Sequence, residues 1–110
     1  MVVFLDPGQM TARLVLEAPQ DAPDGQGGAT RTWQEVAALW ARIEPVSVAS
    51  REQAGAEVGI ITHRIWLGCR DGVQAGLRFR KGNRVFRIKL VHDPDETGRY
   101  LVCRCEEVAR

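Results

Sequence analysis

Alternation of apolar and polar residues, the period of a half-buried β-strand, recurs along most of this chain. It is clearest at 38–44, and the side of this segment predicted to face the core holds Leu39, Ala41 and Ile43. Pro45 has no backbone N–H and is expected to end the strand. Just before the strand, Thr32 and Glu35 can be read as a helix capping box, so 33–37 is predicted to be a turn or a short helical step.

The same alternation predicts further strands at 13–17, 60–69, 77–80, 85–91 and 100–106. Turn-forming residues separate most of them, as in Asp71-Gly72, the hairpin sequence 81–84 and the cluster 92–98. The predicted core consists of Leu14, Leu16, Leu39, Ile43, Ile61, Ile65, Leu67, Phe79, Phe86, Ile88, Leu101 and Cys103. The residues expected to point inward beside them are Leu77, Leu90 and Cys105.

Other stretches do not follow this period. Residues 1–9 read as an irregular arm, and Pro19 is expected to stop the first strand. Residues 19–31 combine glycines and prolines without an apolar period, so a long loop is predicted there. A second long loop, 46–59, would carry a short helix over 51–57 behind a serine cap.

Short strands separated by turns are typical of a small antiparallel β-barrel or sandwich rather than a parallel sheet. We therefore predict a mainly β fold of about five or six strands, with one short helix in a long loop. At 110 residues the chain is expected to be a single domain, 1–110, with one modest core. The hydrophobic fraction of 45% is ordinary for a soluble protein, and no apolar run approaches the ~20 residues that span a bilayer.

No catalytic, nucleotide-binding or metal-binding motif is present, so we expect no enzymatic activity, no cofactor and no metal site. His63 falls on the apolar side of its strand, and His92 lies in a turn beside Asp93. The acidic residues of that turn lack the later glutamate of a calcium loop. The three cysteines, of which Cys103 and Cys105 share a strand face, do not match a zinc pattern and are predicted to be free thiols in a reducing compartment.

The strongest charge feature is a set of basic residues on the predicted hairpin 77–91. The set consists of Arg78, Arg80, Lys81, Arg84, Arg87 and Lys89. Such a face either contacts phosphates or an acidic partner, or it is a solvated strand surface that discourages edge pairing. Because the net charge is only +1, the chain as a whole is not expected to bind polyanions. Trp40 and Trp66 are either core residues or apolar interface anchors.

Short motifs occur in a particular order along nearly the whole chain. They lie at 7–16, where a glycine precedes a basic residue entering the first strand, and then at 24–28, 32–33, 39–45, 51–52, 57, 62–65, 82–88, 93–95 and 100–106. This ordered set resembles the phage head–tail joining proteins, also called head–tail adaptor or head-closure (stopper) proteins. No single motif is diagnostic, and the chain departs from the family pattern at Ala12, Val15 and 69–71.

The resemblance implies a small β-barrel and a non-enzymatic structural protein of the virion neck. About six or twelve copies would form a ring that joins the portal or an adaptor protein on the capsid side to tail terminator and tail proteins, leaving a channel for DNA. The ring would belong to a phage virion or a phage-like gene transfer particle, assembled in the bacterial cytoplasm without a membrane. The expected interface residues are Trp33, Trp40, Arg51, Glu52, Glu57 and Trp66. The basic residues of the hairpin are the candidates for facing the channel or its DNA.

An alternative hypothesis is a small β-barrel that binds nucleic acid. It predicts salt-dependent binding of oligonucleotides by the free monomer. In the neck hypothesis, by contrast, the loops 19–31 and 46–59 are the adaptable parts that become ordered on docking.

Overall fold

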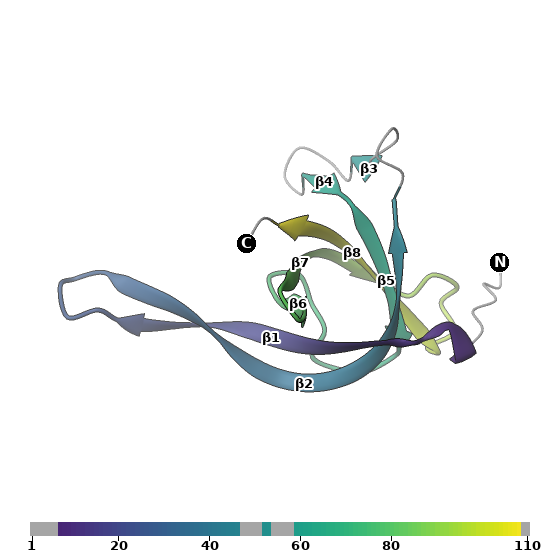
Figure 1. Ribbon diagram of the computed structural model, residues 1–110, viewed down its shortest axis with the longest axis horizontal. Coiled ribbons are helices and arrows are strands. Elements are labelled where there is room, and N and C mark those ends of the chain that lie inside the picture. Colours follow the sequence, from purple (N-terminus) through teal and green to yellow (C-terminus); the bar gives the residue numbers. More distant parts are fainter. Residues whose placement is uncertain (1–6, 47–51, 54–58, 109–110) are drawn as a thin grey trace.

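The computed structural model describes residues 7–46, 52–53 and 59–108. Its strands are β1 (Ala12–Pro23), β2 (Ala29–Pro45), β3 (Glu52–Gln53), β4 (Ile60–Ile61), β5 (His63–Gly68), β6 (Arg78–Lys81), β7 (Arg84–His92) and β8 (Tyr100–Val108), after a 3-10 helix η1 (Pro7–Gln9). Strands β1, β2, β5, β8, β7 and β6, in that order, form an antiparallel sheet that closes into a barrel (Figure 1). The mainly β, antiparallel fold predicted from the sequence is confirmed.

The short helix predicted over 51–57 does not form at the positions of that stretch that the structure describes. Glu52 and Gln53 are instead β3, which pairs with Ile61 and Ile60 of β4. The rest of the predicted helix lies outside the described residues. A helix of only seven residues is marginal in water on its own, so backbone pairing with a neighbouring strand forms instead at these two positions.

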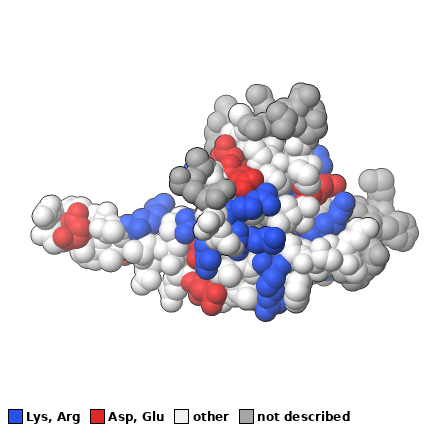
Figure 2. Space-filling view, in the orientation of Figure 1, with Lys and Arg blue, Asp and Glu red and all other residues white. Residues whose placement is uncertain are grey.

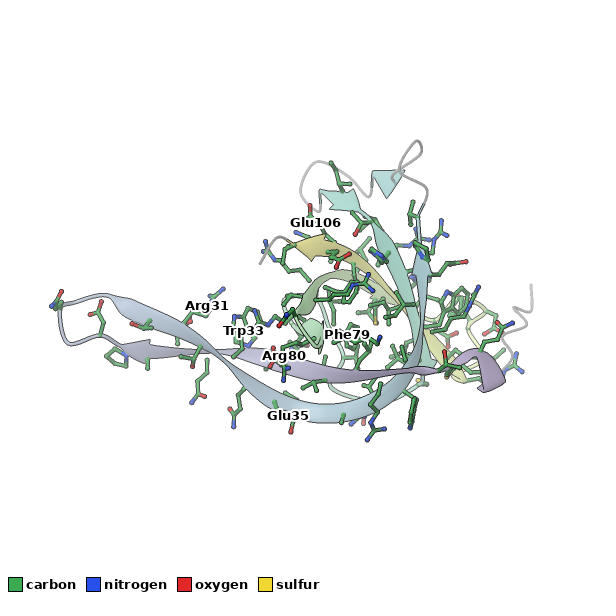
Figure 3. All side chains as sticks on the ribbon, in the orientation of Figure 1. Arg31, Trp33, Glu35, Phe79, Arg80 and Glu106 are labelled. Carbon is green, nitrogen blue, oxygen red and sulfur yellow. The ribbon has the colours of Figure 1, made fainter. Side chains whose placement is uncertain are left out.

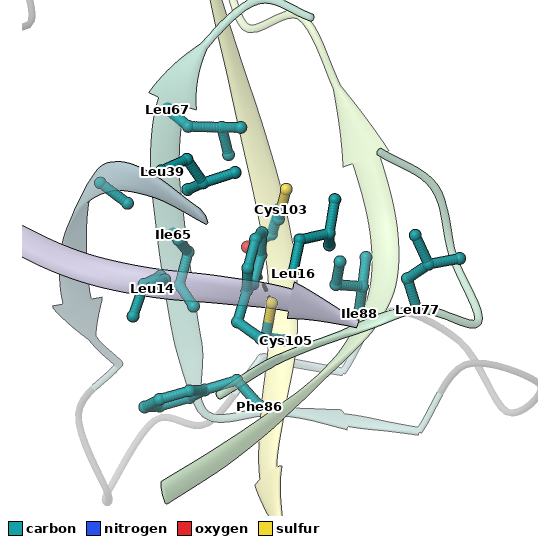
Figure 4. Close-up of a cluster of buried hydrophobic side chains, with 12 residues drawn as sticks. Leu14, Leu16, Leu39, Ile65, Leu67, Leu77, Phe86, Ile88, Cys103 and Cys105 are labelled. Atoms are coloured by element: carbon teal, nitrogen blue, oxygen red, sulfur yellow. Dashed lines mark hydrogen bonds between the residues drawn. The ribbon is translucent and has the colours of Figure 1, made fainter. Parts of the chain in front are cut away.

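The barrel interior is filled by apolar side chains from all six of its strands (Figure 4). The predicted core residues that the structure buries are Leu14, Leu16, Leu39, Ile61, Ile65, Leu67, Phe79, Phe86, Ile88 and Cys103. Ile43 and Leu101 are partly buried and pack against the same cluster. Leu77 and Cys105 also point inward as predicted. Each fully buried aliphatic or aromatic side chain of this kind stabilises the fold by about 1.5–3 kcal/mol.

Leu90 was expected inside, and that prediction is wrong. Its side chain is 38% exposed. The pairing of β7 with β8 shifts between Ile88 and Leu90, because a β-bulge adds a residue to β7 at this point. Every position beyond the bulge changes sides, and Val91 packs against the core in place of Leu90.

The stretch 19–31 is not a long loop, and 33–37 is not a turn or a helical step. Both belong to a long β1–β2 hairpin whose register runs from Ala12 opposite Ala41 to Pro23 opposite Ala29. Its outer part, residues 18–35, extends beyond the barrel as a two-stranded ribbon that we call the arm (Figure 1). The arm makes the molecule elongated, with extents of 52 × 30 × 26 Å along its principal axes.

Pro19 and Pro23 do not stop β1, because the positions they occupy need no N–H. At the tip, the Asp24 N–H donates to the Gly28 carbonyl at 3.2 Å, so even-numbered β1 residues of the arm form the hydrogen-bonded pairs. Pro19 and Pro23 are odd-numbered, and their nitrogens face away from β2. A proline on the outer edge of a two-stranded ribbon therefore costs no ladder hydrogen bond.

The tip is held by an aspartate turn. Asp24 Oδ1 accepts hydrogen bonds from the N–H of Gln26 at 2.7 Å and of Gly28 at 3.1 Å. Gly25 and Gly27 have positive φ angles of 81° and 84°, which residues with a side chain rarely adopt. A Cβ at Gly28 would lie 2.8 Å from Asp24 Oδ2, so the glycine-rich tip has a local structural cause.

Candidate functional site

The basic residues of the β6–β7 hairpin lie mostly beside carboxylates. Lys and Arg side chains gather over the barrel near the base of the arm, with Asp and Glu side chains among them (Figure 2). The ion pairs of this surface are Arg78–Glu17, Arg80–Glu17, Arg84–Glu107 and Lys89–Glu106. For Lys81 and Arg87, the described part of the chain contains no ion-pair partner.

Glu17 is the centre of the tightest of these clusters. It is only 6% exposed, and its two carboxylate oxygens accept hydrogen bonds from Arg78 Nε at 2.7 Å and Arg80 Nε at 3.0 Å. Burial raises the pKa of Glu17, but the hydrogen bonds and charges of the two guanidinium groups outweigh it and hold the pKa below its ordinary value. The cluster joins β1 to β6 at the seam where the barrel closes, through the pairs Val15–Arg80, Leu16–Phe79 and Glu17–Arg78.

A second cluster lies at the other end of the hairpin. Arg84 donates twice to Glu107, from Nε at 2.9 Å and from Nη2 at 3.2 Å. His63 Nε2 lies 3.9 Å from the same carboxylate, and its ring packs edge-on against Phe86. Burial lowers the pKa of His63, Glu107 opposes this shift and Arg84 adds to it. A neutral His63 therefore helps to pack the barrel rather than adding charge to its surface.

The tryptophans predicted as interface residues lie in three different environments. Trp33, on the arm, is partly buried beneath the Arg78 guanidinium, 4.1 Å from its ring centre. Trp66 is also partly buried, and its Nε1–H donates to Glu44 at 3.3 Å. Trp40 is 54% exposed on the outer face of the barrel, with the Arg13 guanidinium 5.2 Å from its ring centre. Of the three, Trp40 is the one available to a partner without rearrangement.

The remaining predicted interface residues are Arg51, Glu52 and Glu57. Arg51 and Glu57 lie outside the described residues. Glu52 is described through its backbone, which pairs with Ile61. Whether these residues contact a neighbouring subunit stays a prediction.

An open groove of about 400 Å³ lies between the arm and the barrel. Its lining residues are Arg31, Trp33, Ala75, Gly76, Arg87, Ile88 and Lys89. Arg31, Trp33 and Arg80 follow one another from the arm toward the barrel (Figure 3). Trp33, Arg87 and Lys89 were predicted as candidates from the sequence, but not as neighbours. Alternation is a local pattern, whereas the groove joins strands that are distant in sequence.

Glu17 was not among the candidate residues predicted from the sequence. The available signal was an acidic residue on the first strand and alternating arginines at 78 and 80. The pairing of β1 with β6 is what turns these residues toward one another, and nothing in the local pattern specifies that pairing.

The buried cysteines and the aspartate-rich turn at 93–98 are explained by packing and by local hydrogen bonds. Burial raises the pKa of Cys103 to about 12, and burial together with Cys103 raises the pKa of Cys105 well above its ordinary value, so neither thiol is a ready nucleophile. Asp93 accepts hydrogen bonds from the N–H groups of Asp95 and Gly98, which closes a turn. Within the described segments, acidic, histidine and cysteine side chains form no cluster able to hold a metal ion, and no helix could cross a bilayer.

Comparison with known proteins places this geometry in context. The sequence model of the phage head completion protein family matches residues 5–108. A chain from the virion of a native gene transfer agent particle has 32% sequence identity and a TM-score of 0.68, over 91% of this chain and 96% of that one. A Shigella flexneri 2a protein solved in solution has 29% identity and a TM-score of 0.72, over 96% and 99% of the two chains. No curated protein matches the sequence.

Proposed function

Because the chain belongs to the phage head completion protein family, whose members are structural virion proteins, we propose that it forms a ring in the neck of a phage-type particle. The ring connects the portal or an adaptor protein on the head side to the tail terminator and tail proteins. DNA passes through its centre. The ring assembles with the particle in the bacterial cytoplasm.

The observation that carries this proposal is the match to a chain of a native gene transfer agent virion. The match covers nearly the whole of both chains at 32% identity, so barrel and arm are compared together. A structural role in a particle of that kind, infectious or gene-transferring, follows most directly from this likeness.

The geometry supports a subunit that works through projecting surfaces. A closed barrel has no free strand edge of its own, so contacts must come from its outer face, its loops and the arm. A ring needs two different patches that meet head to tail. The exposed Trp40 on the barrel wall and the arm are two such patches on one subunit. Large aromatic side chains are common anchors at interfaces.

The charge pattern supports a channel wall that lets DNA slide. Arg78, Arg80 and Arg84 are bound by carboxylates of the same chain, which leaves Lys81 and Arg87 as the basic residues of the hairpin without an ion-pair partner in the described part. Few unpaired cations mean weak counterion release and weak retention of DNA. For the same reason the alternative hypothesis, a dedicated nucleic-acid-binding barrel, has no specific support in this structure.

The proposal is tested by deleting the gene in a particle-producing strain and examining particles by electron microscopy. We expect heads without tails, and restoration of tailed particles when the wild-type gene is supplied in trans. Normal tailed particles in the deletion strain would rule the proposal out.

The channel assignment is tested separately with Lys81→Glu. This exposed side chain can be reversed without breaking a described ion pair, unlike Arg78, Arg80 or Arg84. We expect tailed particles that package or eject DNA abnormally. Unchanged packaging and ejection would mean that Lys81 faces solvent outside the channel.

A further inference from the structure

The two edges of the arm differ in what they offer to another strand. In the arm, even-numbered β1 residues form the hydrogen-bonded pairs with β2, so the odd-numbered residues of both strands direct their backbone groups outward. On β1 these outward positions are Pro19, Asp21 and Pro23. Two of the three lack an N–H, so this edge cannot support a regular ladder.

The β2 edge is open. Its outward positions are Ala29, Arg31, Trp33 and Glu35, and each carries a backbone N–H and a carbonyl. Strand β2 meets β5 only from Arg42 onward, and the described residues provide no backbone partner on this side of 29–35. Unpaired strand edges are templates for pairing, and proteins usually block those they do not use. Here one edge of the arm is blocked by proline and the other is not.

The open edge lies beside the groove described above. Arg31 and Trp33 belong to both, and Arg87 and Lys89 line the groove from β7. Of these three cations, Arg31 contacts Asp21 at 3.0 Å and Lys89 contacts Glu106 at 3.6 Å, while Arg87 has no ion-pair partner in the described part. The groove therefore carries a surplus of positive charge and a partly exposed aromatic wall.

We propose that the β2 edge at 29–35 is a docking site for an extended, acidic polypeptide segment, which joins the arm as a third antiparallel or parallel strand. Backbone hydrogen bonds to Arg31, Trp33 and Glu35 supply its affinity, and acidic side chains reaching Arg87 supply its specificity. This inference rests on the proposed function, since the segment belongs to a neighbouring chain of the neck. A two-stranded ribbon is marginally stable by itself, and a third strand would fix the arm in place.

A matched pair of proline substitutions tests the edge. Arg31→Pro and Asp21→Pro both remove the hydrogen-bonded Arg31–Asp21 ion pair, so that loss is the same in the two variants. Both positions direct their backbone groups outward, so neither variant breaks a backbone hydrogen bond between β1 and β2. Only Arg31→Pro takes a donor from the open edge. With each variant supplied to the deletion strain, we expect its amount in purified particles to fall at least about tenfold for Arg31→Pro and to stay near wild type for Asp21→Pro. Equal incorporation of the two variants would overturn the inference.

Amide hydrogen exchange provides a second readout that needs no substitution. In the free chain the amides of Arg31, Trp33 and Glu35 should exchange rapidly, and in purified particles they should be protected at least about a hundredfold. If wild-type protein is present in particles but these amides exchange as in the free chain, the docking site is wrong and the proposed function stands. If wild-type protein is absent from particles, the proposed function itself fails.

Discussion

Replacing Glu17 by glutamine probes the cluster that closes the barrel. The substitution keeps the shape of the side chain and removes its charge, which leaves Arg78 and Arg80 facing a neutral amide. Removing one partner of a fully buried ion pair typically costs about 3–5 kcal/mol. Here the arginine side chains are 22% and 40% exposed, so water can partly solvate them, and we expect a loss of about 2 kcal/mol.

Urea unfolding followed by tryptophan fluorescence measures this loss, because Trp33 stacks on Arg78 and should report on the seam. For a chain of this size, about 2 kcal/mol also corresponds to a fall in melting temperature of about 8 °C. The matched control is Glu35→Gln, since Glu35 lies opposite Glu17 in the register but is exposed. We expect that control to change stability by less than about 0.5 kcal/mol.

The stability difference between wild type and Glu17→Gln should depend on pH, and the direction of the Glu17 pKa shift gives the sign of that dependence. The pKa of Glu17 is lowered in the folded chain, so its charge stabilises the fold above the unfolded-state pKa, and that contribution disappears as the pH falls through the folded-state pKa. The difference between wild type and Glu17→Gln should therefore be full near neutral pH and shrink in acid. A difference below about 0.5 kcal/mol at pH 7, or one that grows as the pH falls, would refute the reasoning.

Three further predictions concern Trp40, the cysteines and Arg84. Trp40→Ala should leave the unfolding free energy within about 0.5 kcal/mol of wild type, because the ring is already exposed, yet reduce incorporation into particles; normal incorporation would remove Trp40 from the interface. A thiol reagent at pH 8 should label Cys69 rapidly in the native chain and leave Cys103 and Cys105 unlabelled until urea is added, and mass spectrometry of the peptides would expose any early labelling of the buried pair. Arg84→Gln should destabilise the fold by about 1 kcal/mol through the loss of the doubly hydrogen-bonded Glu107 contact, and an unchanged urea midpoint would contradict that contact.

Within the barrel, the residues facing the core were predictable because the information is local. Strict alternation across Leu39, Trp40 and Ala41 puts one side of β2 against the core, and the structure buries Leu39 and Ala41 while exposing Trp40. The same holds for Phe86 and Ile88 on β7. A strand has a period of two wherever one of its faces is buried, whatever its partners are.

The arm was not predicted from the sequence, because the same residue types are typical of both a loop and a two-stranded ribbon. Glycine and proline clusters are typical of loops, but at 19–31 the prolines occupy outward edge positions and the glycines form a tight tip. Loop composition and an edge-blocked ribbon look alike in sequence, since both are polar and both avoid backbone donors. The open edge of β2 could be recognised only from the register with β1.

Local sequence was enough to predict which residues prefer strands, which side of each barrel strand is apolar up to a bulge, and, through ordered motifs, the family. Tertiary structure alone decided that β1 closes on β6, that Glu17 meets two arginines there, that the β7 bulge turns Leu90 outward and that one edge of the arm stays unpaired. The physical reason is that alternation depends on backbone geometry within one strand. Pairing, register shifts and ion pairs depend on which distant strand lies alongside, and that is settled only when the whole barrel closes.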